Sequence, residues 1–382
     1  MLLGGRRREM KTKNFGKLLV IGLIILFVGA SAIPSINASN IDESKLNQID
    51  MNQVEPLLEG TSYFILLSDY TDGAGQENKW AVQIRFDSGL MIVESEFDTV
   101  SLPLILDQWT EIKVDIDLDS DWMEIFYDGE FLHEKEWTAG PNNGYDGVLN
   151  IGAVDLFAYG SSAVFYDDLS LEEVGGSVVW SDDFSSYSLG QFLDGDGTDG
   201  GWKGWDNDPI YGAAVVDIQE LSVPHSVAVV GDTDLVHEYD GYTSGHYIFT
   251  AWIYVPTENL NTPVKPTIDG SMEGDPGTSY DYVFNSVDPD GDDVKYHVDW
   301  GDGNTEVSDF NPSGSDVTIA HTWATSGKYT ITAYGEDSSG LIGPKSTFQV
   351  TMPKEKTVSY LYQRILERFP NAFLILRQLL GL

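Results

Sequence analysis

The stretch FYDDLSLEEVGGSVVWSDDFSSYSLGQ, residues 165–191, decides how many domains the chain contains. Apolar and polar residues alternate on both sides of Gly175-Gly176, which predicts two β-strands joined by a tight turn. Strict alternation predicts that Phe165, Leu169 and Leu171 share one face of the first strand. The turn is either a linker between two domains or a hairpin inside one domain, and the strands on either side must distinguish the two.

Strand-like runs continue on both sides of this stretch. The segment DQWTEIKVDIDLDSDWMEIFYDGEFLHEKEW, residues 107–137, alternates apolar with charged residues and contains a tight Asp128-Gly129 turn. This pattern is typical of antiparallel strands with one face packed and the other in water. The 382 residues allow two or three domains, and amphipathic helical patterns are confined to the C-terminus. We therefore expect an all-β chain.

A resemblance to a known family orders these strands. The W-x-E-I-x-V run at 109–114 and the Y-D-G-x-x-L turn at 127–132 resemble the central hairpin of concanavalin-like and laminin-G-like jelly rolls. Residues 153–173 resemble the last strand of such domains, and residues 180–209 resemble their first strand and the loop after it. The order is therefore inverted, which predicts one circularly permuted jelly-roll sandwich over residues 56–260.

The permuted reading makes two spatial predictions. Because the first and last strands of this family are neighbours, the short loop 173–177 suffices to join them. We expect the strand around 165–171 to lie beside the strand around 178–184. We also expect the strand at 247–255 to lead toward the strand at 62–67. The alternatives are a swapped dimer or two truncated halves, whose open sheet edges would invite aggregation.

The block at residues 264–352 carries a second resemblance with more specific motifs. DWGDG at 299–303, followed by H-x-W and G-x-Y-x-I motifs, resembles the polycystic kidney disease (PKD) repeat, an immunoglobulin-like sandwich found in extracellular proteins. The residues of the two later motifs are His321, Trp323, Gly327, Tyr329 and Ile331. Alternation also predicts that Val298 and Trp300 face a core. We expect a PKD-like domain over residues 261–353.

The N-terminus resembles export machinery. Six cations precede the apolar run at residues 18–30, and Ala30-Ser31-Ala32 offers an A-x-A cleavage site. The run is shorter than the ~20 residues that span a bilayer comfortably. We expect a signal peptide at residues 1–32, with a retained signal anchor as the alternative, and a linker at residues 33–55. The expected location is extracellular or at the cell surface.

Charge and cysteine content exclude several classes of partner and site. The chain carries 61 acidic and 21 basic side chains, a net charge of −40, and loss of residues 1–32 would make this −45. Such a charge argues against nucleic acid as a partner, because phosphates would be repelled. The chain has no cysteine, so disulfides, thiolate nucleophiles and thiolate metal sites are excluded.

The C-terminal segment, residues 354–382, switches to helical spacing and predicts short amphipathic helices interrupted by Pro370. It holds five cations against two anions, and its charges argue against a membrane span. It resembles short tails that follow PKD-like repeats on archaeal secreted proteins. We expect residues Tyr360–Leu382 to contact a membrane surface or a docking partner, with packing on the chain's own domain as the alternative.

Acidic loops are the candidate metal sites. DPDGDD places Asp288, Asp290 and Asp292 in one loop, and Asp337 could approach from the GEDSSG turn. Hard carboxylate oxygens suit calcium, although Asp and Gly also form such turns without a metal. The loop at 194–208 is a second, looser candidate. It departs from an EF-hand because Asp199 stands where glycine is required and Trp205 where glutamate is required.

Aromatic residues and paired carboxylates suggest two kinds of sugar chemistry. Trp202 and Trp205 could stack on sugar rings, although core aromatics are commoner. Asp115, Asp117 and Asp119 share a strand face, which superficially fits the two carboxylates of a glycosidase. That face reads as plain charge alternation without an apolar wall to raise one pKa. We therefore expect no catalytic residues.

These patterns together predict a non-enzymatic, exported adhesion or binding protein. It would recognise a glycan or a protein at the cell envelope, with calcium as a candidate cofactor and the PKD-like domain as a spacer. Three alternatives stay open at this point. They are an accessory binding module of a secreted hydrolase system, a glycoside hydrolase, and a purely structural envelope protein.

Overall fold

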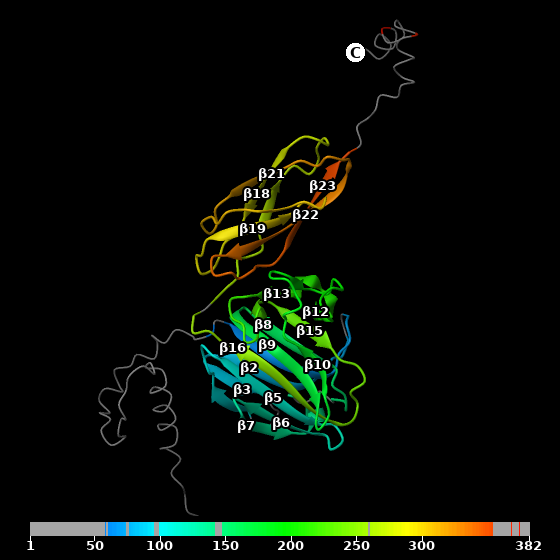
Figure 1. The fold of residues 1–382 in the computed structure, drawn as a ribbon, viewed down its shortest axis with the longest axis vertical. Helices are drawn as coiled ribbons and strands as arrows, with labels where there is room; N and C mark the ends of the chain where they lie inside the picture. Colours follow the sequence, from blue (N-terminus) through cyan, green and yellow to red (C-terminus); the bar gives the residue numbers. More distant parts are fainter. Residues whose placement is uncertain are drawn as a thin grey trace, which may run out of the picture.

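The computed structural model describes residues 58–353 except residues 59, 74–75, 95–98, 142–146 and 259, together with the single residues Arg368 and Leu374. Strands dominate the described residues, so the prediction of an all-β chain is confirmed (Figure 1). The predicted leader, the linker at 33–55 and the helices of the C-terminal segment lie outside the described residues. Among the residues described, no helix is long and apolar enough to cross a membrane.

Two large antiparallel sheets form the first sandwich. Sheet A has seven strands in the order β12-β15-β8-β1-β2-β3-β4. Its strands are β1 (Thr61–Asp69), β2 (Lys79–Asp87), β3 (Leu90–Val93), β4 (Val100–Pro103), β8 (Ala153–Tyr159), β12 (Trp202–Gly204) and β15 (Asp234–Glu238). Strands from both parts of the sequence therefore share one sheet, in which β12 and β15 of the later part extend the edge formed by β8.

Sheet B has nine strands, in the order β11-β13-β14-β9-β16-β5-β6-β7 with β10 paired to β9. Its strands are β5 (Trp109–Asp117), β6 (Trp122–Tyr127), β7 (Glu130–Lys135), β9 (Ser161–Glu173), β10 (Val178–Asp182), β11 (Phe192–Leu193), β13 (Ala213–Val216), β14 (Ser226–Gly231) and β16 (His246–Tyr254). This sheet too mixes the two halves, because β16 lies between β5 and β9.

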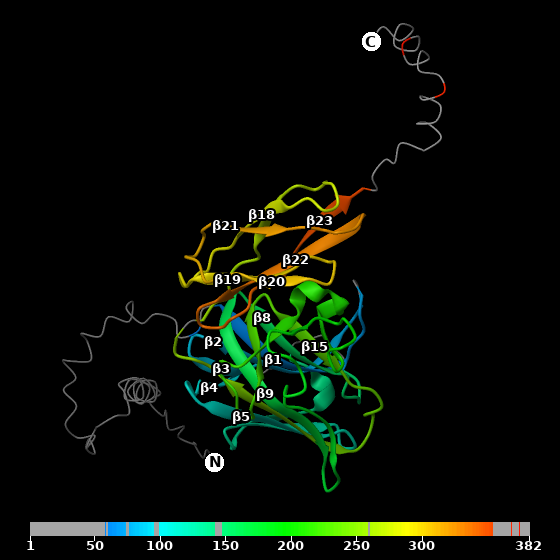
Figure 2. The same ribbon diagram turned by 45° about the horizontal axis from the view of Figure 1, so that its top comes forward.

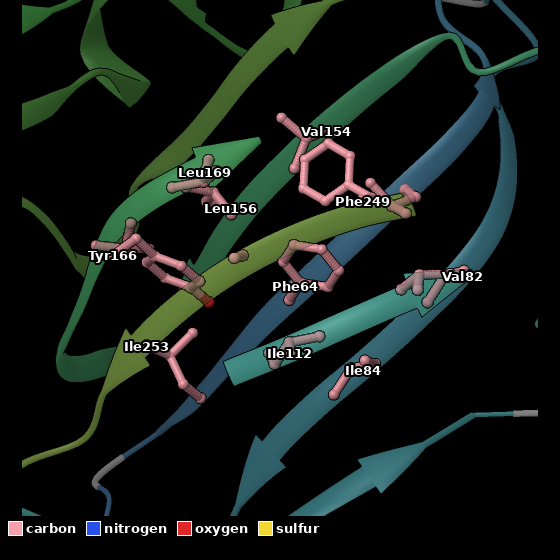
Figure 3. Packing of buried hydrophobic residues seen from close by; sticks show 14 of the residues in the cluster. Phe64, Val82, Ile84, Ile112, Val154, Leu156, Tyr166, Leu169, Phe249 and Ile253 are labelled. Atoms are coloured by element: carbon pink, nitrogen blue, oxygen red, sulfur yellow. The ribbon is translucent and has the colours of Figure 1, made fainter. Parts of the chain in front are cut away.

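The inner faces of the two sheets enclose one continuous apolar core. Alternation in β5 buries Ile112 and Val114 and leaves the charged residues between them partly exposed, as the sequence predicts. Figure 3 shows side chains of both sheets meeting in this core, with Phe64 of β1 beside Phe249 of β16. Their ring centroids lie 5.8 Å apart. The core is therefore built jointly by segments nearly 190 residues apart in sequence.

The strands around the Gly175-Gly176 turn pair as expected. In β9 and β10, Leu171 lies opposite Trp180 and Leu169 opposite Asp182. Gly175 has φ 77°, a left-handed conformation that glycine adopts without strain. The quoted stretch thus contains a hairpin within one sheet, whose first strand, β9, lies between β14 and β16.

The ends of β16 and β1 also lie at the same end of the sandwich, in facing sheets. Ile253 of β16 pairs with Tyr166, whose hydroxyl donates a hydrogen bond to the carbonyl oxygen of Tyr63 in β1. Figure 3 shows the same arrangement, with β16 ending where β1 begins. The two strands do not continue each other within one sheet, but only a connection across the sandwich separates their ends.

One predicted face was wrong. Phe165 does not share a face with Leu169 and Leu171, because a register shift near Asp167 and Asp168 interrupts β9. Asp168 has φ 46°, which inserts a bulge and reverses the alternation beyond it. Leu169 and Leu171 therefore enter the main core, whereas Phe165 points out of the opposite face of sheet B.

The second sandwich, residues 267–352, contains two smaller sheets with the orders β17-β18-β21 and β20-β19-β22-β23. The strands are β17 (Thr267–Gly270), β18 (Tyr280–Asn285), β19 (Val294–Asp299), β20 (Thr305–Val307), β21 (Val317–His321), β22 (Gly327–Asp337) and β23 (Ser346–Met352). Val298, Trp300 and Trp323 are buried in its core, as their positions in the motifs predict.

The two sandwiches contact each other through an apolar interface (Figures 1 and 2). Leu341 and Ile342, from the loop after β22, are buried in a cluster with Phe165 and with apolar residues of β11, β13 and β14. Lys345 adds an ion pair with Asp194 at 3.0 Å. Part of the outer face of sheet B is therefore covered by the PKD-like sandwich, and part of the outer face of sheet A is covered by a smaller apolar cluster that includes Trp80 and Trp205.

Candidate functional site

A pocket of about 290 Å³ lies on the outer face of sheet A. Strands β1, β2, β8 and β15 and the short helix η4 (Trp205–Asn207) supply its lining. The lining residues are Tyr63, Ile65, Trp80, Gln83, Pro141, Asp155, Phe157, Trp205 and Asp234. The pocket thus combines aromatic walls with two carboxyl groups, the composition expected of a site for a small polar ligand.

The η4 loop sets the position of Trp205. The side chain of Trp205 stacks on Trp80 with ring centroids 6.2 Å apart and an interplanar angle of 20°, and its ring meets Tyr70 edge-on at 4.9 Å. The backbone N–H of Asp206 donates to the Tyr70 hydroxyl, and its carboxylate accepts from the N–H of Gly73. These contacts hold the indole as one wall of the pocket.

The floor of the pocket is a buried carboxyl pair. Asp155 of β8 and Asp234 of β15 lie on neighbouring antiparallel strands, and Asp155 is only 3% exposed. The two carboxyls face the same side of the sheet and interact with each other, although Asp234 as a whole is only partly buried. Burial is the main cause that raises the pKa of both groups above the ordinary range.

The Asp155–Asp234 pair has unused acceptor capacity. Within the described part of the chain, no N–H or O–H group donates to the Oδ1 atom of either residue. Such atoms are costly when buried without a partner. The pair therefore points to a ligand that brings a donor or a positive charge.

A second buried carboxyl pair lies in the second sandwich, at the loops predicted to bind calcium. Asp288 and Asp337 are 2% and 1% exposed. The Oδ1 atom of Asp288 accepts from two backbone N–H groups, and that of Asp337 accepts from two backbone N–H groups and the Ser339 hydroxyl. The Oδ2 atom of each has no partner among the described residues. Burial, with repulsion from Asp288, raises the pKa of Asp337 to about 6.

The other two predicted calcium ligands have different surroundings. Both carboxylate oxygens of Asp290 accept hydrogen bonds from Asn261, at 2.7 and 3.0 Å, in the segment between the sandwiches. The Oδ1 atom of Asp292 accepts from the Ser338 hydroxyl at 3.0 Å. Asp288 and Asp337 therefore interact as a pair, whereas no three of the four predicted ligands lie close enough together to share an ion in the described structure.

Trp202 and Trp205 are not brought together. Trp202 is 1% exposed in the main core, and its indole N–H donates to Asp182 at 2.9 Å. No ring face of Trp202 is open to a sugar, so its prediction as a ligand-binding residue is corrected here. The three-residue strand β12 points this side chain inward, and the following turn points Trp205 outward.

The acidic loop at 194–199 is explained by its own hydrogen bonds. Asp194, Asp196 and Asp199 lie close enough to share an ion. Asp199, however, is buried and accepts three backbone N–H groups of the loop at its Oδ2 atom, while Gln191 and Thr198 donate to its Oδ1 atom. Asp199 therefore serves as the anchor of the turn.

The carboxylates considered for glycosidase chemistry lie on the outer face of sheet B. Asp115 pairs with His246, and Asp117 accepts from the N–H groups of Asp119 and Ser120. Asp119 accepts from the N–H of Gly245. Those bonds stabilise the ends of β5 and β16, and they give these residues structural roles.

Sequence reasoning missed most of the pocket. Trp205 was found as an aromatic residue in an acidic loop, but Tyr63, Trp80, Asp155 and Asp234 were not. One signal was available, because Asp155 is the single charge inside the otherwise apolar and aromatic run AVDLFAY. A charge at a position where the strand is apolar on both faces indicates a buried carboxyl with a specific role.

Comparison with known proteins identifies the second sandwich. Residues 261–352 match the PKD domain family. The solved PKD domain of an M14-like peptidase from a Thermoplasmatales archaeon is 38% identical in sequence, with a TM-score of 0.24. The match covers 98% of that domain and 25% of this chain. The predicted PKD-like domain is therefore confirmed.

Two further solved structures match more of the chain at much lower identity. The glycoside hydrolase domain of Endo-D from Streptococcus pneumoniae is 8% identical over 77% of this chain and 36% of its own length, with a TM-score of 0.21. A protein from Corynebacterium diphtheriae described as membrane anchored is 10% identical over 79% of this chain and 61% of its own, with a TM-score of 0.20. No curated protein matches the chain in sequence.

Proposed function

We propose that this chain, which belongs to the PKD domain family through residues 261–352, is a non-enzymatic binding protein of the cell envelope that recognises a glycan on the outer face of sheet A. The observation that carries this proposal is the pocket walled by Tyr63, Trp80, Phe157 and Trp205. Flat aromatic faces suit the C–H faces of a sugar ring, and the polar groups of Gln83 and the carboxyl pair can hydrogen-bond its hydroxyls.

A binding role fits the carboxyl groups better than hydrolysis does. Glycoside hydrolases keep their two carboxyls roughly 5 to 9.5 Å apart, so that a sugar carbon or a water fits between them. Asp155 and Asp234 instead lie on directly neighbouring strands and interact with each other, which fits a shared binding role better than two separate catalytic roles. Asp115 and Asp117 are held by structural contacts on the opposite sheet. We therefore propose that the chain has no catalytic residues.

The proposed location is outside the cell. The sequence signature of a signal peptide at residues 1–32 supports export. The PKD domain would then present the glycan site as a docked spacer, since Leu341 and Ile342 bury an apolar contact with the first sandwich. The basic segment Tyr360–Leu382 would contact a membrane surface or a docking partner, in keeping with its charge and helical spacing.

Calcium is the proposed cofactor of the PKD domain. The unpartnered Oδ2 atoms of Asp288 and Asp337 are buried oxygen ligands whose charges are not compensated within the described residues. Asp292 does not lie close enough to form a group of three ligand atoms with them, so calcium would take its other ligands from backbone oxygens or water. Calcium prefers such hard oxygen ligands, and its charge would offset the repulsion within the pair.

We also propose that residues 56–260 form a circularly permuted concanavalin-like jelly roll. The pairing of β9 with β10 across a short turn supports a seam at residues 173–177. The proximity of the end of β16 to the start of β1 supports an original connection there. A single cooperative unfolding transition of monomeric residues 56–260 is expected, and separate transitions or obligate dimers would contradict the permutation.

A glycan array tests the proposed function. The full chain is expected to bind at least one class of immobilised sugar, and Trp205→Ala is expected to weaken that binding by ~10-fold or more. The matched control is Trp122→Ala, because Trp122 is a partly exposed tryptophan of sheet B far from the pocket. The absence of any hit, in calcium and in chelator, would overturn the proposal, as would equal effects of the two substitutions.

A further inference from the structure

The floor of the proposed glycan site has a property that neutral sugars do not require. Asp155 and Asp234 present two Oδ1 atoms to which no described residue donates, and Asp155 is 3% exposed. A buried carboxyl oxygen is stabilised only by a proton, a hydrogen-bond donor or a cation. The pocket is the side from which a ligand can supply one of these.

The walls favour positive charge as well. Tyr63 and Phe157 stack with ring centroids 5.5 Å apart at an interplanar angle of 20°, beside the stacked pair of Trp80 and Trp205. The faces of aromatic rings carry negative partial charge and attract cations within about 6 Å. The carboxyl pair and the aromatic rings therefore both favour a positively charged ligand.

No cation belongs to the lining of this pocket. The residues that line the pocket include no lysine, arginine or histidine. Lys203 of β12 forms ion pairs with Asp72 and Glu238. Arg85 of β2 forms an ion pair with Glu94. Asp206 adds a further negative charge near Asp234. The pocket is consequently anionic, and it would repel sulfated or carboxylated sugars.

The size of the pocket limits the ligand to a small group. Its volume of about 290 Å³ is at the lower end of small-molecule sites. One sugar residue or a compact amine fits this description better than an extended polymer segment. A longer glycan would insert one residue and leave the others over the exposed rim.

We propose that the pocket binds an amine-bearing sugar, whose protonated amino group contacts the Asp155–Asp234 pair while its ring lies against Trp205. This proposal rests on the proposed glycan-binding function and names its ligand class. In the complex, both carboxyls are ionised, any proton that they held passes to solvent, and the ammonium donates hydrogen bonds to the two Oδ1 atoms. Such charge-assisted bonds are stronger than the bonds that a sugar hydroxyl would make.

Titration calorimetry with three matched trisaccharides tests the proposal. The full chain is titrated with β-1,4-linked trimers of glucosamine, N-acetylglucosamine and glucose at about 0.15 M and 0.5 M salt, so that non-specific attraction to the acidic surface is screened. The glucosamine trimer is expected to bind ~10-fold or more tightly than the two neutral trimers at both salt concentrations.

Two single-charge variants separate the pocket from the acidic surface. Asp155→Asn is expected to abolish the preference for glucosamine, whereas Asp115→Asn, which removes one surface charge of sheet B, is expected to retain it. Trp205→Ala is expected to weaken binding of all three trimers. If Asp155→Asn fails to fold, judged by its thermal unfolding, Asp234→Asn serves as the test.

The pH profile provides an independent readout. Burial raises the pKa of Asp234 to about 6, and the titratable groups that interact with the pair are Asp206 from η4 and Tyr166 of β9. Because the amine needs ionised carboxyls, the preference for glucosamine is expected to fall as the pH drops from 7 to 5. Asp155→Asn is expected to lack this dependence.

The possible failures can be told apart. Neutral trimers that bind as tightly as the glucosamine trimer would overturn the amine proposal and leave glycan binding intact. A preference for glucosamine that disappears at high salt, or that survives Asp155→Asn, would also overturn it. Absence of binding to all three trimers, with a glycan array free of hits, would overturn the proposed function as well.

Discussion

The described residues include two carboxyl pairs with buried oxygen atoms, which differ in their position in the fold and in the groups around them. Asp155 and Asp234 lie on neighbouring strands of the first sandwich, under aromatic side chains and without backbone donors to their Oδ1 atoms. Asp288 and Asp337 lie at loops of the PKD domain, and one oxygen of each already accepts several hydrogen bonds. Both pairs keep unpartnered oxygens, and burial raises their pKa values.

The difference in surroundings indicates which cation each pair would hold. Backbone donors fix the orientation of the loop carboxylates and leave only hard oxygen ligands free, which suits calcium. Aromatic walls surround the strand pair with polarisable surfaces, which suit an organic ammonium group. We therefore expect the groups that surround a carboxyl pair, more than its charge, to determine which cation it binds.

The largest expected effect is that of calcium on the PKD domain. At 100 to 1,000 times its dissociation constant, calcium is expected to raise the free energy of unfolding by about 2.7 to 4 kcal/mol, because it binds only the folded loops. Asp337→Asn is expected to abolish the response, which differential scanning calorimetry in calcium and in chelator would measure.

Asp290→Asn is the matched control for this prediction. Asp290 belongs to the same loop, but both of its oxygens are engaged by Asn261. The variant is expected to keep the calcium response. The calcium site would be contradicted if the free energy of unfolding of the full chain were the same in calcium and in chelator. Equal loss of the calcium response in Asp337→Asn and Asp290→Asn would also contradict it.

The next effect concerns pH in the absence of calcium. Burial raises the pKa of Asp337 to about 6, above its value of ~3.9 in an unfolded chain, so the folded state binds the proton more tightly. The contribution of protonated Asp337 to the free energy of unfolding is fully present below about pH 4, and it is lost as the pH rises through about 6. The loss is expected to be roughly 1 to 2 kcal/mol.

A difference measurement isolates this contribution from other titrating groups. Burial lowers the pKa of His237 to about 4, which changes stability in the opposite direction over the same range. The difference in unfolding free energy between the full chain and Asp337→Asn cancels that term. A difference that stays constant from pH 4 to pH 7 would show that Asp337 is not held protonated.

The interface between the domains provides a test of intermediate size. Ile342 is 6% exposed against the first sandwich, in the loop whose Leu341 N–H bonds Asp337. Ile342→Ser is expected to lose about 1 to 3 kcal/mol and to separate the unfolding transitions of the two domains. Val307→Ser, at an exposed site of the PKD domain, is expected to change neither. Coincident transitions in both variants would contradict the docked arrangement.

The smallest effect is expected for exposed carboxylates. Asp115→Asn is expected to change the free energy of unfolding by less than about 1 kcal/mol, because its pair with His246 is partly exposed to solvent. Binding of glycans should not change. A loss of polysaccharide hydrolysis in this variant, measured as released reducing ends, would instead revive the glycosidase alternative.

Much of the fold could be predicted from local patterns. The alternation in β5, the turn at Gly175-Gly176 and the DWGDG motif each report on neighbouring residues, so they led correctly to strands, a hairpin and a PKD domain. The face of Phe165 was wrong because the bulge at Asp168 depends on pairing with β16, which lies some 80 residues away. Local alternation carries no information about such a bulge.

The candidate sites were less accessible to sequence reasoning. Asp288 and Asp337 were found because acidic loops have a recognisable composition. Asp155 and Asp234 are about 80 residues apart, and only the order of strands β8 and β15 brings them together. Trp202 and Trp205 look equivalent in sequence, yet one lies in the core and the other in the pocket wall.

Thermal unfolding of three chains in two ligands tests the central claim most directly. The full chain, Asp155→Asn and Asp337→Asn are each heated with calcium and with the glucosamine trimer. Calcium is expected to stabilise the full chain and Asp155→Asn only, whereas the trimer is expected to stabilise the full chain and Asp337→Asn only. If either substitution removes both responses or neither, the two carboxyl pairs do not hold separate cations.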